Sequence, residues 1–172
     1  MNKKLKEKLF LEVYQKYRPA IHRICYGYIY EKEQVDDLFQ EIMLNIWNSL
    51  DKFKGDAKVG TWAYRVAVNT ALLYNRKTSR YNNVKLSMGD GEVAVDYQAT
   101  EEQKLNELKL NQLGQSISRL EKQDRLIISL ILEELTYEQV AEIVGITPNY
   151  VGVKVTRIKK QLYELLKKYD NE

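Results

Sequence analysis

The sequence is poor in the residues on which disulfide, metal and nucleophilic chemistry depend. Its 172 residues include one cysteine, Cys25, and one histidine, His22. A single thiol cannot form an internal disulfide, and two possible ligands are fewer than a zinc site needs. The sequence has no phosphate-binding glycine loop, no dinucleotide fingerprint and no nucleophile–histidine pair. We therefore expect no metal, no cofactor and no enzymatic activity of the isolated chain.

Long apolar runs are also missing. The longest, from Leu126 to Leu132, is interrupted by Ser129 and is too short to span a bilayer. The first eight residues hold four lysines and lack the apolar stretch of a signal peptide. Because a lone thiol also suits a reducing compartment, we expect a cytoplasmic protein without membrane insertion.

What the sequence does have is helical periodicity. Apolar residues recur every three or four positions along nearly the whole chain, and no stretch alternates as a strand would. The pattern is interrupted at Pro19 and Gly55 and is lost between residues 81 and 102. We predict an all-α protein of two small domains. These are a four-helix bundle in residues 1–80 and a helix–turn–helix domain in residues 103–172, joined by a flexible linker in residues 81–102.

Charge is distributed unevenly, although the net charge is only +3. Residues 31–41 hold five acidic side chains and one lysine. Residues 71–85 hold four basic side chains and no acid, and residues 148–169 hold six basic side chains and one acid. Such segments are typical of two contacts with polyanions and one with a protein surface, although solvated helix faces give the same pattern.

The strongest local motif is a helix–turn–helix in the second half. Thr136 and Gln139 match a capping box, in which each side chain bonds a free backbone N–H of the other. Gly145 suits the left-handed residue that ends a helix. Thr147 is a good N-cap, and Pro148 is well placed at the first position of the next helix.

The second helix of this motif has two chemically different faces. Val151, Val155 and Ile158 form an apolar stripe that should face the core. The opposite face is short or polar at its start and basic further along; it carries Asn149, Val153, Thr156, Arg157 and Lys160. A recognition helix needs this order, because base edges are contacted first and phosphates after. The alternative is a hairpin packed only for structure, with a solvated basic face.

The first half carries two further motifs. Asp37, Gln40 and Glu41 are spaced to lie on one exposed side of a helix. Residues 61–69 interleave aromatic, amide and basic groups beside a loop, a combination that can bind a single nucleic-acid strand. Trp62 is one of these residues, and its alternative role is packing in the core, because it continues an apolar stripe with Val59, Val66 and Leu73.

Together these motifs resemble the extracytoplasmic-function (ECF) sigma factors, the smallest members of the sigma-70 family. The resemblance covers almost the whole chain, from about Tyr14 to Leu166. It rests on Asp37-Leu38-Phe39-Gln40-Glu41, on Phe53-Lys54-Gly55 continuing through Thr61-Trp62 to Val68-Asn69, and on the helix–turn–helix ending in Arg157-Ile158-Lys159-Lys160.

The resemblance implies a factor that binds core RNA polymerase through its β′ and β subunits, recognises promoter DNA and initiates transcription under the control of an anti-sigma factor. Polymerase binding, through the β′ coiled coil, is implied for Asp37, Gln40 and Glu41. Capture of a flipped base of the start-proximal element is implied for Phe53, Lys54, Gly55, Asp56 and Ala57.

The remaining residues that the resemblance assigns would contact DNA. Contact with the melted strand is implied for Trp62, Tyr64, Arg65 and Asn69, and contact with the flanking duplex for Arg76 and Lys77. Reading of the upstream element in the major groove is implied for Asn149, Val153, Lys154, Thr156, Arg157 and Lys160.

Two positions depart from the family, and a different class of protein shares one motif. Family members often carry lysine or arginine where this chain has Gly152 and a small polar residue where it has Val153. A glycine inside a helix costs about 1 kcal/mol relative to alanine, so upstream specificity cannot be copied from the family. A dimeric DNA-binding regulator would use the same helix–turn–helix, but it has no need for the two motifs of the first half.

Overall fold

Helices form all of the regular structure in the residues that the computed structural model describes, which are 2–29, 32–55, 58–81 and 101–169. The elements in chain order are α1 (Lys3–Ile29), α2 (Lys32–Ser49), the 3-10 turn η1 (Leu50–Lys52), α3 (Val59–Tyr81), α4 (Glu101–Ser118), α5 (Lys122–Leu132), α6 (Tyr137–Val144) and α7 (Pro148–Tyr169). The predicted all-α class is confirmed. Most of the predicted linker, residues 82–100, lies outside the described residues. Within the described ranges, no helix combines the length and the apolar character needed to cross a membrane.

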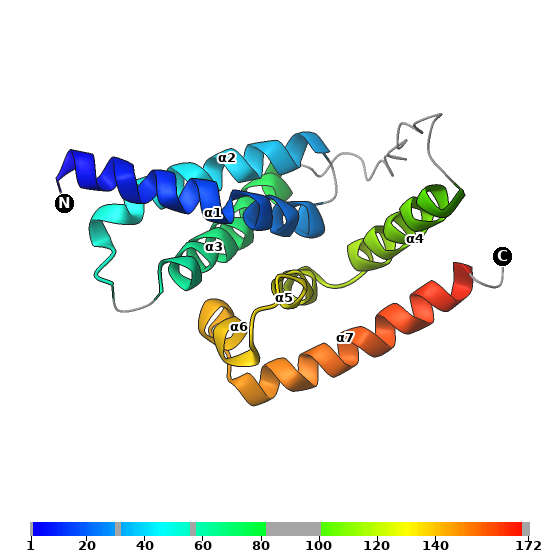
Figure 1. Cartoon of the computed structure of the whole chain (residues 1–172). Helices are drawn as coiled ribbons and strands as arrows, with labels where there is room; N and C mark the ends of the chain where they lie inside the picture. Colours follow the sequence, from blue (N-terminus) through cyan, green and yellow to red (C-terminus); the bar gives the residue numbers. More distant parts are fainter. Residues whose placement is uncertain (1, 30–31, 56–57, 82–100, 170–172) are drawn as a thin grey trace.

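The N-terminal half is formed by α1, α2 and α3, which pack pairwise against one another (Figure 1). Ile21 and Ile24 of α1 meet Leu38 of α2 in a fully buried core, and α3 contributes the small residues Ala63 and Ala67. Alanine at the contact lets the helix backbones approach closely. The core therefore follows most of the apolar pattern predicted from sequence, except at the start of α1, where Leu5 is exposed, and toward the end of α3, where Leu73 is exposed.

The predicted break at Pro19 does not occur, so the described N-terminal half has three α-helices where the sequence predicted four. Helix α1 runs through this residue without interruption from Lys3 to Ile29. A proline inside a helix costs about 3 kcal/mol or more, because it removes a backbone hydrogen bond and crowds the preceding turn. Here Val13 before the proline and Ile21 after it are both fully buried against the neighbouring helices. Burial on both sides of Pro19 outweighs that cost and keeps the two stripes on one helix.

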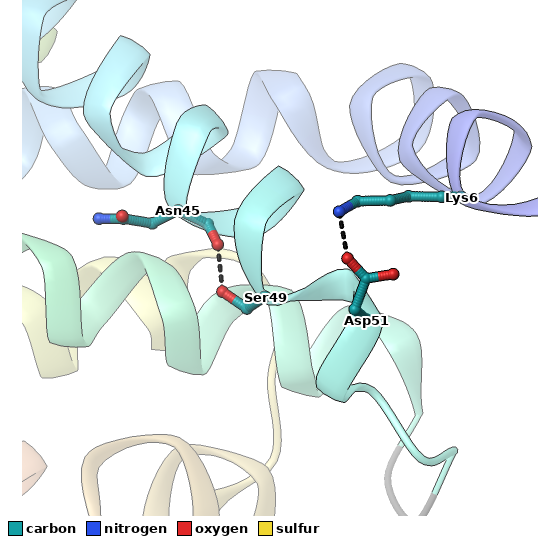
Figure 2. Close-up of polar contacts among 4 residues, drawn as sticks. All are labelled: Lys6, Asn45, Ser49 and Asp51. Carbon is teal, nitrogen blue, oxygen red and sulfur yellow. Dashed lines mark hydrogen bonds and ion pairs between the residues drawn. The ribbon is translucent and has the colours of Figure 1, made fainter. Parts of the chain in front are cut away.

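Polar contacts secure the end of α2 (Figure 2). The Ser49 hydroxyl donates to the backbone carbonyl of Asn45, and Lys6 of α1 pairs with Asp51 of η1. This hydrogen bond from Lys6 lowers the pKa of the Asp51 carboxyl. The Asn45 amide donates to Thr70 Oγ1 of α3 at 3.1 Å. These contacts tie α2 and η1 to both other helices and fix where the following loop begins.

In the C-terminal half, α5, α6 and α7 surround a second group of buried apolar residues. Leu126 and Leu130 of α5 pack with Val140 of α6 and with Val155 and Ile158 of α7. Helix α4 packs along the far end of the long helix α7 (Figure 1). The stripe that was predicted to face the core in α7 is therefore buried as expected.

A buried ion pair joins α7 to α5. Lys154 Nζ lies 2.7 Å from Asp124 Oδ1, and the two side chains are only 11% and 6% exposed. The predicted role of Lys154 in reading upstream DNA does not fit this position, because its ammonium group is enclosed against α5. Sequence spacing could not show this, since Asp124 lies 30 residues earlier in the chain.

The two halves also touch each other, α1 against α4 and α5, and α3 against α6. The Arg23 guanidinium of α1 donates twice to the Glu133 carboxylate, at 2.6 and 2.7 Å, and these bonds raise the pKa of Arg23. Close to this pair, α1 approaches α5 so tightly that a Cβ placed on Gly27 would lie 2.5 Å from Ser129 Oγ. The buried residues of both halves form one continuous cluster.

We expect the Asp124–Lys154 pair to behave as a coupled unit in stability measurements. Removing one partner leaves a buried charge unpaired, which costs about 3–5 kcal/mol. Lys154→Met or Asp124→Leu alone should therefore lower the free energy of unfolding by about that amount in a denaturant titration, whereas the double substitution should lower it much less. Lys160→Met, at an exposed position of the same helix, is the control and should change stability by under about 0.5 kcal/mol. Additive losses in the double variant would contradict the coupling.

Candidate functional site

The acidic face of α2 is open to solvent. Asp37 and Gln40 are exposed and Glu41 is half-buried, while Leu38 on the opposite side of the helix is fully buried. Tyr74 of α3 lies near this face: burial raises the pKa of its hydroxyl, and the carboxylates of Asp37 and Glu41 raise it further. The predicted set of side chains therefore shares one surface, which Tyr74 extends.

The loop after η1 places an aromatic residue against α3. The ring of Phe53 lies with its centroid 5.0 Å from that of Trp62, at an interplanar angle of 45°. Lys54 and Gly55 are exposed, and Gly55 has a φ of 82°, a left-handed conformation that glycine adopts without strain. The remaining two residues of the predicted base pocket, Asp56 and Ala57, lie outside the described residues.

The predicted strand-binding residues of α3 divide into two groups. Trp62, Arg65 and Asn69 follow one another at helical spacing and are half-buried or exposed. Tyr64 points elsewhere: it is 6% exposed, its ring meets that of Tyr17 edge-on, and burial raises its pKa to about 12. Tyr64 is therefore a packing residue in this arrangement, whereas the other three share a surface.

Two further predictions for α3 have different outcomes. The predicted core stripe ends early, because Leu73 is 55% exposed. Trp62 does pack against the core cluster, as its alternative interpretation proposed, but it keeps part of its surface in solvent. Arg76 and Lys77 lie on the last turns of α3, and their side chains are outside the described residues.

The helix–turn–helix has the caps that its sequence predicted. Thr136 Oγ1 accepts from the Gln139 N–H, and the Gln139 side chain accepts from the Thr136 N–H at 2.9 Å, so the capping box is complete. Gly145 ends α6 with a φ of 79°. Thr147 Oγ1 accepts from the backbone N–H of Tyr150 and thereby caps α7. These contacts fix the angle at which α7 leaves the turn.

The solvent face of α7 presents the predicted recognition residues, apart from Lys154. The exposed members are Asn149, Val153, Thr156, Arg157 and Lys160. Thr156 Oγ1 donates to the backbone carbonyl of Gly152 at 3.0 Å, so its hydroxyl hydrogen is already engaged within the helix. Tyr137, the first residue of α6, completes this face: a Cβ on Gly152 would lie 3.4 Å from its ring.

One residue of the candidate strand surface is engaged by the other half of the chain. Arg65 Nη2 lies 2.8 Å from Oε1 of Glu142 on α6, and both side chains are partly exposed. Sequence reasoning missed this pair and the Arg23–Glu133 pair, because each joins residues that lie far apart in the chain. It missed Tyr137 as well. The glycine inside the predicted recognition helix, Gly152, was the signal that could have drawn attention to this face.

No cluster of three or more His, Cys, Asp or Glu side chains that could hold a metal occurs in the described part of the chain. Cys25 is fully buried, and that burial raises the pKa of its thiol to about 12. The thiolate needed for metal binding or nucleophilic attack is therefore strongly disfavoured at Cys25. His22 contacts Asp36 at 3.4 Å and the ring of Phe39 edge-on.

Two family profiles match the chain in the predicted order. Sigma-70 region 2 matches residues 13–81, and Sigma-70 region 4 matches residues 110–162. Among curated proteins, the RNA polymerase sigma factor YlaC of Bacillus subtilis is 25% identical, over 94% of this chain and 94% of that protein. The ECF RNA polymerase sigma factor SigW of the same organism is 24% identical, over 95% and 94%.

Solved structures share the fold. The sigma factor RpoE from Bartonella quintana, in complex with the anti-sigma factor NepR, matches with a TM-score of 0.70 at 22% identity, covering 96% of this chain and 98% of that one. CnrH, in complex with the cytosolic domain of CnrY, matches with a TM-score of 0.66 at 18% identity, covering 92% and 88%. With both matched regions in place and relatives aligned along nearly their full length, the chain belongs to the ECF subfamily of the sigma-70 RNA polymerase sigma factors.

Proposed function

We propose that this sigma factor directs core RNA polymerase to promoters through three surfaces carried by two domains, residues 1–80 and 103–172. The observation that carries the proposal is the presence, in one chain, of an exposed acidic face on α2 and a capped helix α7 with an exposed polar and basic face. The polymerase performs the chemistry of transcription in the cytoplasm, and this chain supplies position and sequence selectivity. Run-off transcription with core polymerase on genomic fragments tests the whole proposal.

The first surface, formed by Asp37, Gln40 and Glu41, would bind the polymerase β′ subunit. Asp37 is exposed and Glu41 is half-buried, and their carboxylates match a basic or polar partner. The core contacts of α2 come mainly from its other side, through Leu38 and Ile42. A partner could therefore bind the acidic face while the packing of Leu38 and Ile42 is kept.

The second surface, formed by the Phe53–Trp62 ring pair with Arg65 and Asn69, would bind the melted start-proximal strand. Stacking on aromatic rings contributes about 1–3 kcal/mol per base and tolerates any base sequence. In the present arrangement Arg65 pairs with Glu142, so a DNA phosphate must replace that carboxylate before Arg65 can hold the strand. Strand binding by Arg65 therefore competes with its ion pair to Glu142.

The third surface is the outer face of α7, which would read the upstream element as duplex. Arg157 and Lys160 are long exposed cations suited to phosphates, whereas Asn149 and Thr156 are short and suited to base edges. Lys154 is left out of this proposal because it pairs with Asp124 inside the fold.

An anti-sigma factor is the third partner that we propose, after core polymerase and promoter DNA. One structure of the same fold is a complex with the anti-sigma factor NepR, and another is a complex with the cytosolic domain of CnrY. In this chain, contact between the halves brings α1, α4 and α5 around an apolar hollow of about 390 Å³ lined by Tyr26, Leu113, Ile117 and Leu132. An inhibitor that bound here would hold the halves together and keep Arg65 with Glu142.

Replacing the acidic face should separate polymerase binding from folding. The triple variant Asp37→Ala, Gln40→Ala, Glu41→Ala should bind core polymerase at least tenfold more weakly in a titration, while its melting temperature stays nearly unchanged. The matched control is the variant Glu7→Ala, Glu12→Ala, Gln15→Ala, which removes two carboxylates and an amide from the exposed side of α1. If the Asp37, Gln40, Glu41 variant binds core polymerase normally, or if it unfolds, the assignment is refuted.

The two classes of residue on α7 should differ in how they affect promoter binding by the holoenzyme. Arg157→Ala and Lys160→Ala should each weaken binding to all duplexes and reduce the salt slope by about one. Asn149→Ala and Thr156→Ala should cost roughly 1–3 kcal/mol on the cognate site alone. Anisotropy titrations at several salt concentrations on cognate and scrambled duplexes would separate these effects. A uniform loss for all four variants would place upstream specificity in DNA shape instead.

Releasing Arg65 should expose the strand-binding surface of the free chain. Glu142→Gln removes the charge that holds Arg65, so the affinity for a single-stranded start-proximal oligonucleotide should rise several-fold, and adding Arg65→Ala should abolish the gain. Glu134→Gln, which removes an exposed charge in the preceding turn, is the control and should have no effect. An unchanged affinity of Glu142→Gln would show that the ion pair does not limit strand binding.

A further inference from the structure

We propose that Tyr137 and Val153 form an apolar pad that reads thymine methyl groups in the upstream promoter element. This inference rests on the proposed duplex recognition by α7. It adds a base identity to that function, and it adds a residue from α6 to the recognition surface.

The pad lies at the start of the recognition helix. A shallow hollow of about 510 Å³ is lined by Tyr137, Pro148, Asn149, Gly152, Val153 and Thr156. Residues 149, 152, 153 and 156 are spaced to share one face of α7, and Tyr137 reaches this face from the first turn of α6. The hollow is therefore built by both helices of the motif.

The chemistry of the hollow is apolar where a recognition helix is expected to be polar. Val153 is 57% exposed and Tyr137 is 40% exposed, although burying such side chains would be favourable. Thr156 donates its hydroxyl hydrogen to the carbonyl of Gly152, so this hydrogen is already engaged within the helix. Val153 and Tyr137 are thus two neighbouring, partly exposed side chains with large apolar surfaces beside α7.

The Tyr137 ring lies beside Gly152. A Cβ at this position would lie 3.4 and 3.7 Å from two ring carbons of Tyr137, which is ordinary van der Waals contact, so alanine would also fit. An interior glycine costs about 1 kcal/mol of helix stability relative to alanine. The short distances show that the Tyr137 ring reaches the outer face of α7 at this point.

The charged residues near the pad indicate that its binding partner is DNA. Arg157 and Lys160 lie exposed one to two turns along the same helix, which favours a polyanion over an apolar protein partner. Within the major groove, thymine alone presents a methyl group, and apolar side chains are its natural contact. Asn149 at the edge of the hollow is suited to adenine, whose N6 and N7 an amide can bond together. We therefore expect the pad to prefer a thymine beside an adenine contacted by Asn149.

The test uses holoenzyme, formed from this chain and core polymerase, on duplexes recovered by selection. Each thymine of the upstream element is replaced in turn by deoxyuridine, which removes the methyl group and keeps the base pairing. Binding should weaken about fourfold at one or two adjacent positions, the effect of one buried methyl group. In Val153→Ala and Tyr137→Ala the penalty at those positions should fall to nearly none.

Tyr163→Ala is the matched control. Tyr163 is an exposed aromatic residue of α7, about 15 Å along the helix axis from Val153, and its replacement should leave the deoxyuridine penalty intact. If the holoenzyme binds selected duplexes but deoxyuridine weakens binding at no position, the proposed thymine contact is refuted, whereas the proposed duplex recognition by α7 is not. A penalty that persists in both pad variants would also overturn it. Failure to select any duplex would refute the proposed duplex recognition itself and, with it, the pad.

Discussion

The packing of α7 against α5 and α6 is the constraint on which the rest of the molecule depends. Val155 and Ile158 are buried, and the Lys154–Asp124 ion pair is enclosed beside them, so the helix can turn only one face outward. A buried pair tolerates little displacement, because a shifted partner would leave a charge unpaired in a low-dielectric interior. The outward face, with Asn149 at its start and Lys160 further along, follows from that rotation.

Charged side chains serve different purposes in the fold according to their exposure. The Lys154–Asp124 pair is enclosed and holds two helices of one half. The Arg65–Glu142 pair joins the two halves, remains partly exposed, and is therefore screened by salt and open to competition from other anions. In the proposed promoter complex the same guanidinium would hold a DNA phosphate, and it could not pair fully with Glu142 at the same time.

The helix–turn–helix brings residues of two helices to one surface. Gly152 lowers the helix propensity of α7, and the ring of Tyr137 from the neighbouring helix lies close to it. Tyr137 of α6 therefore lines one hollow together with residues 149, 152, 153 and 156 of α7. In the proposed recognition of duplex DNA, the binding surface would be built from both helices of the motif.

The sequence by itself determined the helical class, the buried stripes and the caps of the helix–turn–helix, because periodicity and capping depend on residues three or four positions apart. The acidic face of α2 and most of the outer face of α7 were predictable for the same reason. Only the tertiary structure decided that α1 continues through Pro19, that Tyr64 and Lys154 are buried, and that Arg65 meets Glu142. Each of these outcomes depends on contact between residues distant in the chain, whose packing and charge pairing override the local pattern.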